Sequence, residues 1–167
     1  MMKRVLLFFL IYLFSITTSY ANDRDVRLNQ LFNELKVNQT NVAANVAQEI
    51  WLLWSTHPTD QKLTSILDEG SRLVQDRQLT RAISVFSEAI ELDPTWAEAW
   101  NKRATVFYMV GEFQKSQDDI DKVLELENRH FGALAGQGMV NIKLTLIFTL
   151  KSDHRGHRND VNKLSKR

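Results

Sequence analysis

The sequence predicts an all-α fold in which antiparallel helix pairs stack one after another as a short solenoid. The main observation is internal repetition, because residues 63–96 and residues 97–130 have equal lengths and align without a gap. Apolar residues in each unit recur at three- and four-residue intervals, as on one face of a helix. A period of this size marks a repeat architecture, in which each unit buries its apolar face against its neighbours.

The segment 1–21 has the layout of a secretory signal peptide. A basic start, MMKR, precedes the apolar run VLLFFLIYLF, and the small residues Ser19 and Ala21 then stand at the −3 and −1 positions of a cleavage site. The apolar run is short for a membrane span. We therefore expect cleavage after Ala21, with Asn22 as the mature N-terminus and export to a periplasm-like compartment. The alternative is an uncleaved N-terminal membrane anchor.

Residues 22–62 predict a helix pair that acts as a divergent repeat or as an N-terminal cap. Both of its helices carry an apolar stripe. The stripe of the first helix consists of Leu28, Leu31, Phe32 and Leu35, and that of the second consists of Val42, Val46, Ile50, Leu53 and Trp54.

The repeat in residues 63–96 predicts two helices joined by a short turn near Asp76–Gln78. Asp93–Pro94 should end the second helix, since proline disfavours a helical conformation in the residue before it. Gly70 and Ala104 occupy the same position in the two repeats, and both are small. Small side chains let two helices approach closely, so these positions mark the contact point within each helix pair.

These units resemble tetratricopeptide repeats (TPRs), and the resemblance covers residues 63–130. The first unit matches the family's signature at Gly70, Leu73, Ala82, Phe86, Ala89 and Pro94, and the second matches it at Trp100, Ala104 and Phe107. The second unit departs from the signature at Arg103, Ser116, Ile120, Val123 and Asn128. The resemblance implies a right-handed TPR solenoid, with residues 63–96 as its first repeat and residues 97–130 as its second. It also implies that Trp100 fills the crossing between helices, whereas Trp96 should contribute much less to stability.

A third repeat begins at residues 131–150, where Leu134 and Gly138 hold the positions of Trp100 and Ala104. No turn residue follows Leu144. Residues 151–167 then lack apolar periodicity, which predicts a disordered basic tail. Two explanations stay open. Either the last helix was lost through a change of reading frame, which would make the chain a truncated remnant without retained activity, or Met139–Leu150 belongs to one longer capping helix.

Charge and cysteine content exclude several classes of function. The chain has no cysteine, which rules out disulfides, thiol catalysis and thiolate zinc sites. Residues 22–150 carry 13 Lys or Arg against 18 Asp or Glu, a net charge of −5, and residues 151–167 carry six against two, a net charge of +4. An acidic body argues against nucleic acid as a partner, because phosphate binding needs a clustered positive face.

No motif predicts catalysis, a cofactor or a metal. The sequence lacks a glycine-rich phosphate loop, a nucleophile elbow and a zinc motif. Asp118, Asp119 and Asp121 lack the glycine and spacing of a calcium loop, so we expect them on a solvated helix face. His154 and His157 have no third ligand nearby. The sequence therefore predicts a non-enzymatic protein.

In tetratricopeptide repeats the first helices of successive repeats line a concave groove that receives a peptide or a protein segment. Carried over by position, the resemblance implies a groove lined by Leu67, Ser71, Val74, Glu98, Asn101, Thr105, Tyr108 and Met139. Glu98 would repel a C-terminal carboxylate, so an apolar or basic segment suits this groove better. We expect a scaffold that binds a protein or peptide, without nucleic acid and without stable membrane insertion after signal cleavage. The partner's identity and the oligomeric state stay open.

Overall fold

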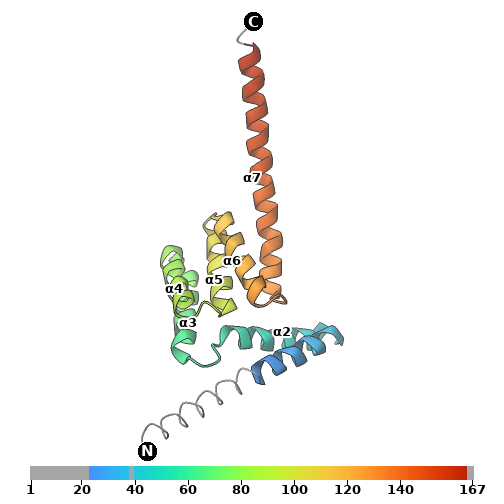
Figure 1. Cartoon of the computed structure of the whole chain (residues 1–167), viewed down its shortest axis with the longest axis vertical. Helices are drawn as coiled ribbons and strands as arrows, with labels where there is room; N and C mark the ends of the chain where they lie inside the picture. Colours follow the sequence, from blue (N-terminus) through green and yellow to red (C-terminus); the bar gives the residue numbers. More distant parts are fainter. Residues whose placement is uncertain (1–22, 38–39, 165–167) are drawn as a thin grey trace, which may run out of the picture. The chain divides into compact units, whose positions relative to one another are not determined.

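The computed structural model describes the backbone of residues 23–37 and 40–164, and the side chains of residues 23–37 and 42–151. The expected cleavage site at Ala21 lies outside these residues. The described chain is helical throughout, apart from short connections (Figure 1). It divides into two compact units, Met1–Ile66 and Leu67–Arg167. The predicted fold class, antiparallel helix pairs stacked in sequence, is confirmed.

The first unit contains a helix over residues 23–37 and the helix α2 (Thr40–Ser55). Their predicted stripes supply its core, in which Leu31 and Ile50 are fully buried. At the edge of this core, both Arg27 Nε and Nη2 donate hydrogen bonds to Glu49 Oε1, at 2.9 and 2.6 Å. Apolar burial therefore joins the two helices, and an exposed ion pair across their edge adds little.

The second unit repeats its backbone with a spacing of 34 residues. Helix α4 (Leu79–Leu92) recurs as α6 (Phe113–Leu126), and α5 (Ala97–Met109) recurs at the start of α7 (Phe131–Leu164). Asp93 and Glu127, which follow α4 and α6, have nearly equal dihedral angles of φ −141°, ψ 93° and φ −143°, ψ 93°. The prediction that Asp93–Pro94 ends a helix is confirmed.

The turns between paired helices are also equivalent in the two repeats. Helix α3 (Gln61–Gln75) is followed by Arg77 in the left-handed region at φ 59°, and α5 is followed by Gly111 at φ 83°. In each turn the residue after the left-handed position donates its N–H to the carbonyl five residues earlier. Gln78 donates to the Leu73 carbonyl at 2.8 Å, and Glu112 donates to the Phe107 carbonyl at 2.9 Å. This Schellman-type ending reverses the chain, so the following helix returns antiparallel.

Small residues set the close helix contacts, as predicted. A Cβ atom added at Gly70 would lie 2.3 Å from Phe86 Cε1, so only glycine fits between α3 and α4. In the next pair, Ala104 is buried, and its carbonyl accepts a hydrogen bond from the Ser116 hydroxyl at 2.8 Å. Ser116 thus replaces the signature residue with a small side chain that bonds the neighbouring backbone.

Trp96 and Asp119 are more buried than the sequence predicts. Trp96 is buried at 4% exposure, whereas Trp100 is half-buried and packs against the core that contains Ala104 and Ile120. How much each tryptophan contributes to stability stays a prediction. Trp100 Nε1 donates to the Pro94 carbonyl at 3.0 Å. Asp119 is buried at 4% exposure rather than solvated, because Arg103 pairs with both of its carboxylate oxygens at 2.8 Å.

Helix α7 also differs from the expectation for the C-terminal segment. It runs from Phe131 to Leu164, whereas the sequence predicts a disordered tail from residue 151 onward. The disorder of residues 151–167 stays a prediction. The stretch Met139–Leu150 is part of this one long helix, and the loss of a last helix through a change of reading frame stays an open alternative. No proline interrupts the segment and no turn residue follows Leu144, so nothing in the local sequence ends the helix there.

Candidate functional site

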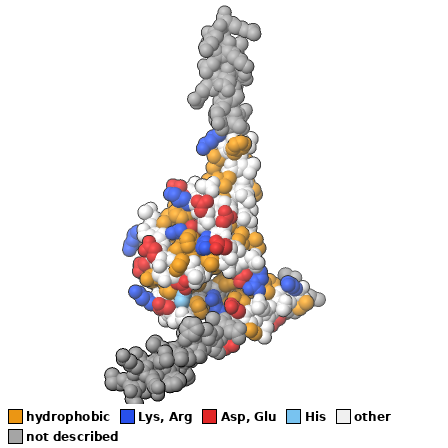
Figure 2. All heavy atoms as spheres, in the orientation of Figure 1, with side chains coloured by type: hydrophobic (Ala, Val, Ile, Leu, Met, Phe, Trp, Pro, Cys, Tyr) orange, Lys and Arg blue, Asp and Glu red, His pale blue; other side chains and the backbone are white. Residues whose placement is uncertain are grey.

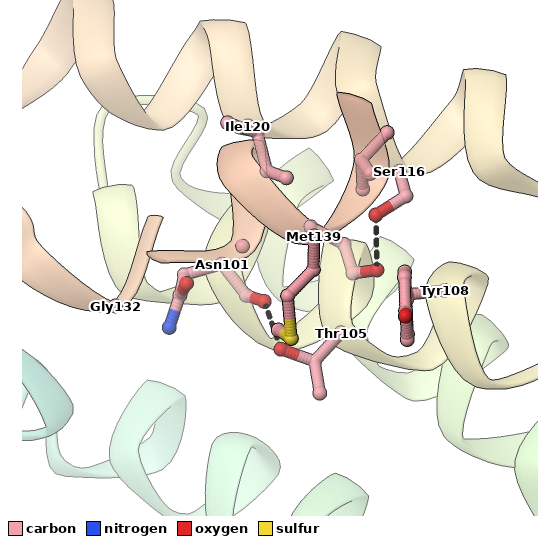
Figure 3. Close-up of a pocket in the computed structure, with 10 residues that line it drawn as sticks. Asn101, Thr105, Tyr108, Ser116, Ile120, Gly132 and Met139 are labelled. Carbon is pink, nitrogen blue, oxygen red and sulfur yellow. Dashed lines mark hydrogen bonds between the residues drawn. The ribbon is translucent and has the colours of Figure 1, made fainter. Parts of the chain in front are cut away.

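A pocket of about 70 Å³ opens between α5, α6 and α7, and part of the predicted groove lies around it. Asn101, Thr105 and Tyr108 on α5 face Met139 on α7 across the opening (Figure 3). Apolar and small residues complete the lining. They are Ala104, Ser116, Ile120, Gly132, Gly136 and Val140. A volume of this size holds about two water molecules or one short aliphatic side chain.

The pocket exists because α7 approaches α6 closely and then leaves space beside α5. A Cβ atom added at Gly136 would lie 3.3 Å from Ile120 Cδ1, so glycine permits the approach. Val140 and Ile120 are almost fully buried beneath the opening. Met139 directly precedes Val140 on α7, yet it is 50% exposed and forms a wall of the pocket. The floor is therefore rigid and apolar, while one wall is a flexible thioether side chain.

Two polar side chains of α5 at the rim of the pocket already make hydrogen bonds. Asn101 Nδ2 donates to Glu98 Oε2 at 3.0 Å, which assigns the amide orientation because a carboxylate only accepts. The Thr105 hydroxyl donates to the Asn101 main-chain carbonyl at 3.0 Å. The Asn101 side-chain oxygen and the Thr105 hydroxyl oxygen can still accept hydrogen bonds, so a ligand that donates can bond to this rim.

Behind the rim, Glu98 forms a buried polar cluster that the sequence did not predict. Its side chain is fully buried, and its Oε2 lies 2.9 Å from Nε2 of His130, which is also fully buried. His130 Nδ1 accepts the N–H of Ala133 at 3.1 Å, which places the ring proton on Nε2 and makes that atom the donor to Glu98. The Lys102 ammonium lies 3.3 Å from Glu98 Oε1. The carboxylate is thus a structural anchor between α5 and the first turn of α7.

The three predicted groove residues on α3 do not line this pocket. Leu67 is 1% exposed and belongs to the core, so it cannot face an open groove. The Ser71 hydroxyl donates to the Leu67 carbonyl at 2.8 Å, and Val74 is half-buried. The structure therefore brings together Asn101, Thr105, Tyr108 and Met139, with Glu98 directly behind them.

Metal ligands do not gather in the described part of the chain. No group of three His, Asp or Glu residues that could hold a metal ion occurs within it. The side chains of His154 and His157 lie outside the described side chains.

Several known proteins are similar to this chain, although no protein-family model matches it. A TPR repeat-containing protein of Rhizobium etli is 36% identical over 126 residues, which cover 72% of this chain and 61% of the relative. Tetratricopeptide repeat protein 36 of Caenorhabditis elegans is 31% identical over 108 residues, which cover 65% of this chain and 59% of that protein. Sperm-associated antigen 1 of Rattus norvegicus is 29% identical over 91 residues, or 51% of this chain and 10% of the relative. The chain spans about three fifths of the length of the first two.

Proposed function

The chain belongs to the TPR repeat-containing proteins by its homologues, and from this premise we propose that it is a non-enzymatic scaffold that binds another protein or a peptide. The binding surface is the groove between α5 and α7. The observation that carries the proposal is the pocket between these helices, with its apolar floor and polar rim. Recognition sites of this kind combine apolar burial with a few polar groups that fix orientation.

The partner in this proposal is an extended segment that inserts one short aliphatic side chain into the pocket. A pocket of about 70 Å³ suits a short aliphatic side chain better than a large aromatic one. Main-chain N–H groups of the segment would donate to the Asn101 and Thr105 oxygens. A free C-terminal carboxylate is disfavoured, because one N–H of the Asn101 amide already donates to Glu98 and the Lys102 ammonium lies close to the same carboxylate.

A peptide display library selected against the full chain tests this function. We expect selected peptides to share an internal aliphatic residue, and we expect Thr105→Arg to reduce their affinity by about tenfold or more by filling the opening. Ser84→Arg, at an exposed position on α4, is the matched control and should leave affinity unchanged. Peptides that bind both variants equally would place the binding surface elsewhere and overturn the groove proposal.

We also propose that the protein acts in an exported compartment after cleavage between Ala21 and Asn22. The basic start, short apolar run and small residues of segment 1–21 support this proposal. Mass spectrometry of the protein produced in a secreting host should find Asn22 at the N-terminus. Recovery of intact Met1 in the membrane fraction would instead establish the N-terminal anchor.

A further inference from the structure

Helix α7 carries apolar side chains well beyond the region where the fold covers them. Near its start, Ala133 and Val140 are buried in the core shared with α6. Farther along, exposure rises to 53% at Leu146, 69% at Phe148 and 61% at Leu150. Figure 1 shows α7 continuing past the ends of α5 and α6, and Figure 2 shows apolar side chains along its described part.

The exposed apolar side chains of this segment point in several directions around the helix. Each residue turns the helix by about 100°, so Leu146 and Leu150 share a face with Ile142, whereas Phe148 projects from a different side. Ile142 is 61% exposed. Ile142, Leu146 and Leu150 therefore form an apolar stripe along one face of α7. A helix with such a stripe can lie in a bilayer interface with that face toward the acyl chains.

A second copy of the chain is a poor fit for this surface. The residues from Met139 to Leu150 extend over roughly 17 Å of helix, at about 1.5 Å per residue. A stable dimer interface usually takes about 20–30 residues from each side. Five exposed apolar side chains on one helix fall well short of that.

The basic residues that follow the apolar segment of α7 suit an anionic lipid surface. Lys151 follows Leu150 directly, and the sequence from residue 151 to residue 167 carries six Lys or Arg against two Asp, a net charge of +4. Basic residues beside an apolar helix are attracted to anionic lipid headgroups. The acidic body, with a net charge of −5 over residues 22–150, would be repelled by the same headgroups. The charge distribution therefore orients the chain with α7 toward the lipid.

The segment cannot cross the bilayer while the protein is folded. By length and composition, Phe131–Lys151 could span a membrane, and only 11% of its most apolar window is buried. However, its first turns are held in the fold by the buried Ala133 and Val140 and by the His130–Glu98 hydrogen bond. We propose that residues 139–151 of α7 dock on an anionic lipid surface and lie at its interface, with Ile142, Leu146 and Leu150 facing the upper acyl chains.

A fluorophore on α7 tests the proposal, and the absence of cysteine makes specific labelling simple. Single variants Leu146→Cys and Leu150→Cys of the full chain are labelled with an environment-sensitive nitrobenzoxadiazole dye. Leu92→Cys is the matched control, because Leu92 is 54% exposed on α4 and Leu146 is 53% exposed on α7. A local probe separates docking of α7 from any membrane contact made by residues 1–21.

We expect the dye at positions 146 and 150 to brighten and shift to the blue with vesicles of phosphatidylcholine and phosphatidylglycerol, and the dye at position 92 to stay unchanged. In the labelled Leu150→Cys chain, adding Leu146→Lys should raise the lipid concentration needed for a half-maximal response by about tenfold or more, and adding Leu92→Lys should not. Circular dichroism should show that these variants keep their helicity.

Three results would overturn the proposal. The fluorescence of the α7 dyes could stay unchanged while the protein sediments with the vesicles, which would assign binding to another segment. Their fluorescence could shift without lipid as protein concentration rises, which would identify a second copy as the occupant. An equal response to vesicles of phosphatidylcholine alone would remove the role of anionic headgroups.

Discussion

At the scale of single residues, Arg103 contributes more to this fold than a surface arginine would. Its guanidinium pairs with both oxygens of Asp119 on α6, and its Nη1 donates to the Ser87 hydroxyl on α4 at 2.9 Å. It also lies over the Trp100 ring, with Cζ 5.0 Å from the ring centroid. One side chain thereby links three consecutive helices, in a repeat that departs from the TPR signature at that position.

Asp119→Ala should therefore lower the free energy of unfolding by about 3 kcal/mol, because it leaves the largely buried Arg103 charge without its carboxylate partner. Urea denaturation measures this loss. The control is Glu125→Ala, which removes an exposed ion pair with Lys122 at 2.9 Å and should cost less than about 1 kcal/mol. Equal losses for the two variants would show that the buried pair does not stabilise the fold.

Glu127, the residue that follows α6, should make stability depend on pH. Burial acts to raise the pKa of Glu127, but hydrogen bonds and the positive charge from Arg129 outweigh it and lower the pKa below the usual 4.5. A lowered pKa stabilises the folded state above the unfolded value of about 4.5, and this contribution is lost as pH falls through the folded pKa. Glu127→Gln should thus be less stable than the native chain near neutral pH, with the difference shrinking in acid.

Chemical denaturation at a series of pH values measures this difference. In an Arg129→Met background, Glu127→Gln should have a much smaller effect at neutral pH, because the partner that lowers the pKa is gone. A stability difference that stays constant from neutral pH into acid would contradict the assignment.

At the scale of helices and turns, the two repeats reach the same backbone with different residues. The left-handed position after the first helix is Gly111 in one repeat and Arg77 in the other. A side chain in this region costs roughly 1–2 kcal/mol, which glycine avoids. The equivalent turns indicate that the helix packing on both sides imposes this conformation on Arg77.

Arg77→Gly should consequently raise the free energy of unfolding by about 0.5–1 kcal/mol, after the greater flexibility of glycine in the unfolded chain is subtracted. Arg72→Gly, within α3, is the control and should lower stability by about 1 kcal/mol. Thermal and urea denaturation distinguish the two. If Arg77→Gly also destabilised the chain, the strain at this turn would be smaller than the dihedral angle implies.

At the scale of the whole molecule, the buried start of α7 and its exposed later part differ in how much they contribute to stability. Val140 is fully buried in the core with Ile120 and Val123. The described residues from Leu146 to Lys151 are exposed, apart from the half-buried Ile147. The early turns of α7 therefore close the core, while the later residues are available for contact outside the fold.

Ending the chain after Lys151 should leave helicity per residue and the thermal midpoint nearly unchanged. Ending it after Gly138 should lower the midpoint clearly, because the loss of Val140 and Leu144 uncovers the apolar faces of Ile120 and Val123. Circular dichroism during heating measures both. A large loss from the first truncation would mean that residues 152–167 stabilise the fold.

The all-α class, the 34-residue spacing of the helices and the approach of Gly70 to its partner helix follow from the amino-acid sequence alone. The sequence also indicates part of the pocket lining, in Asn101, Thr105, Tyr108 and Met139. These features follow from periodicity, from proline and glycine, and from the matching of one repeat to the next, all of which are local in the chain.

The pairing of polar groups in the interior depends on contacts between distant parts of the chain. Arg103 and Asp119 are 16 residues apart in sequence, and Glu98 and His130 are 32 residues apart. The burial of Trp96 and the burial of Leu67, which the sequence predicts in the groove, depend on such contacts too. A side chain's exposure depends on what packs against its helix from distant parts of the chain, and the periodicity of one helix gives its apolar face but not the neighbour that covers it.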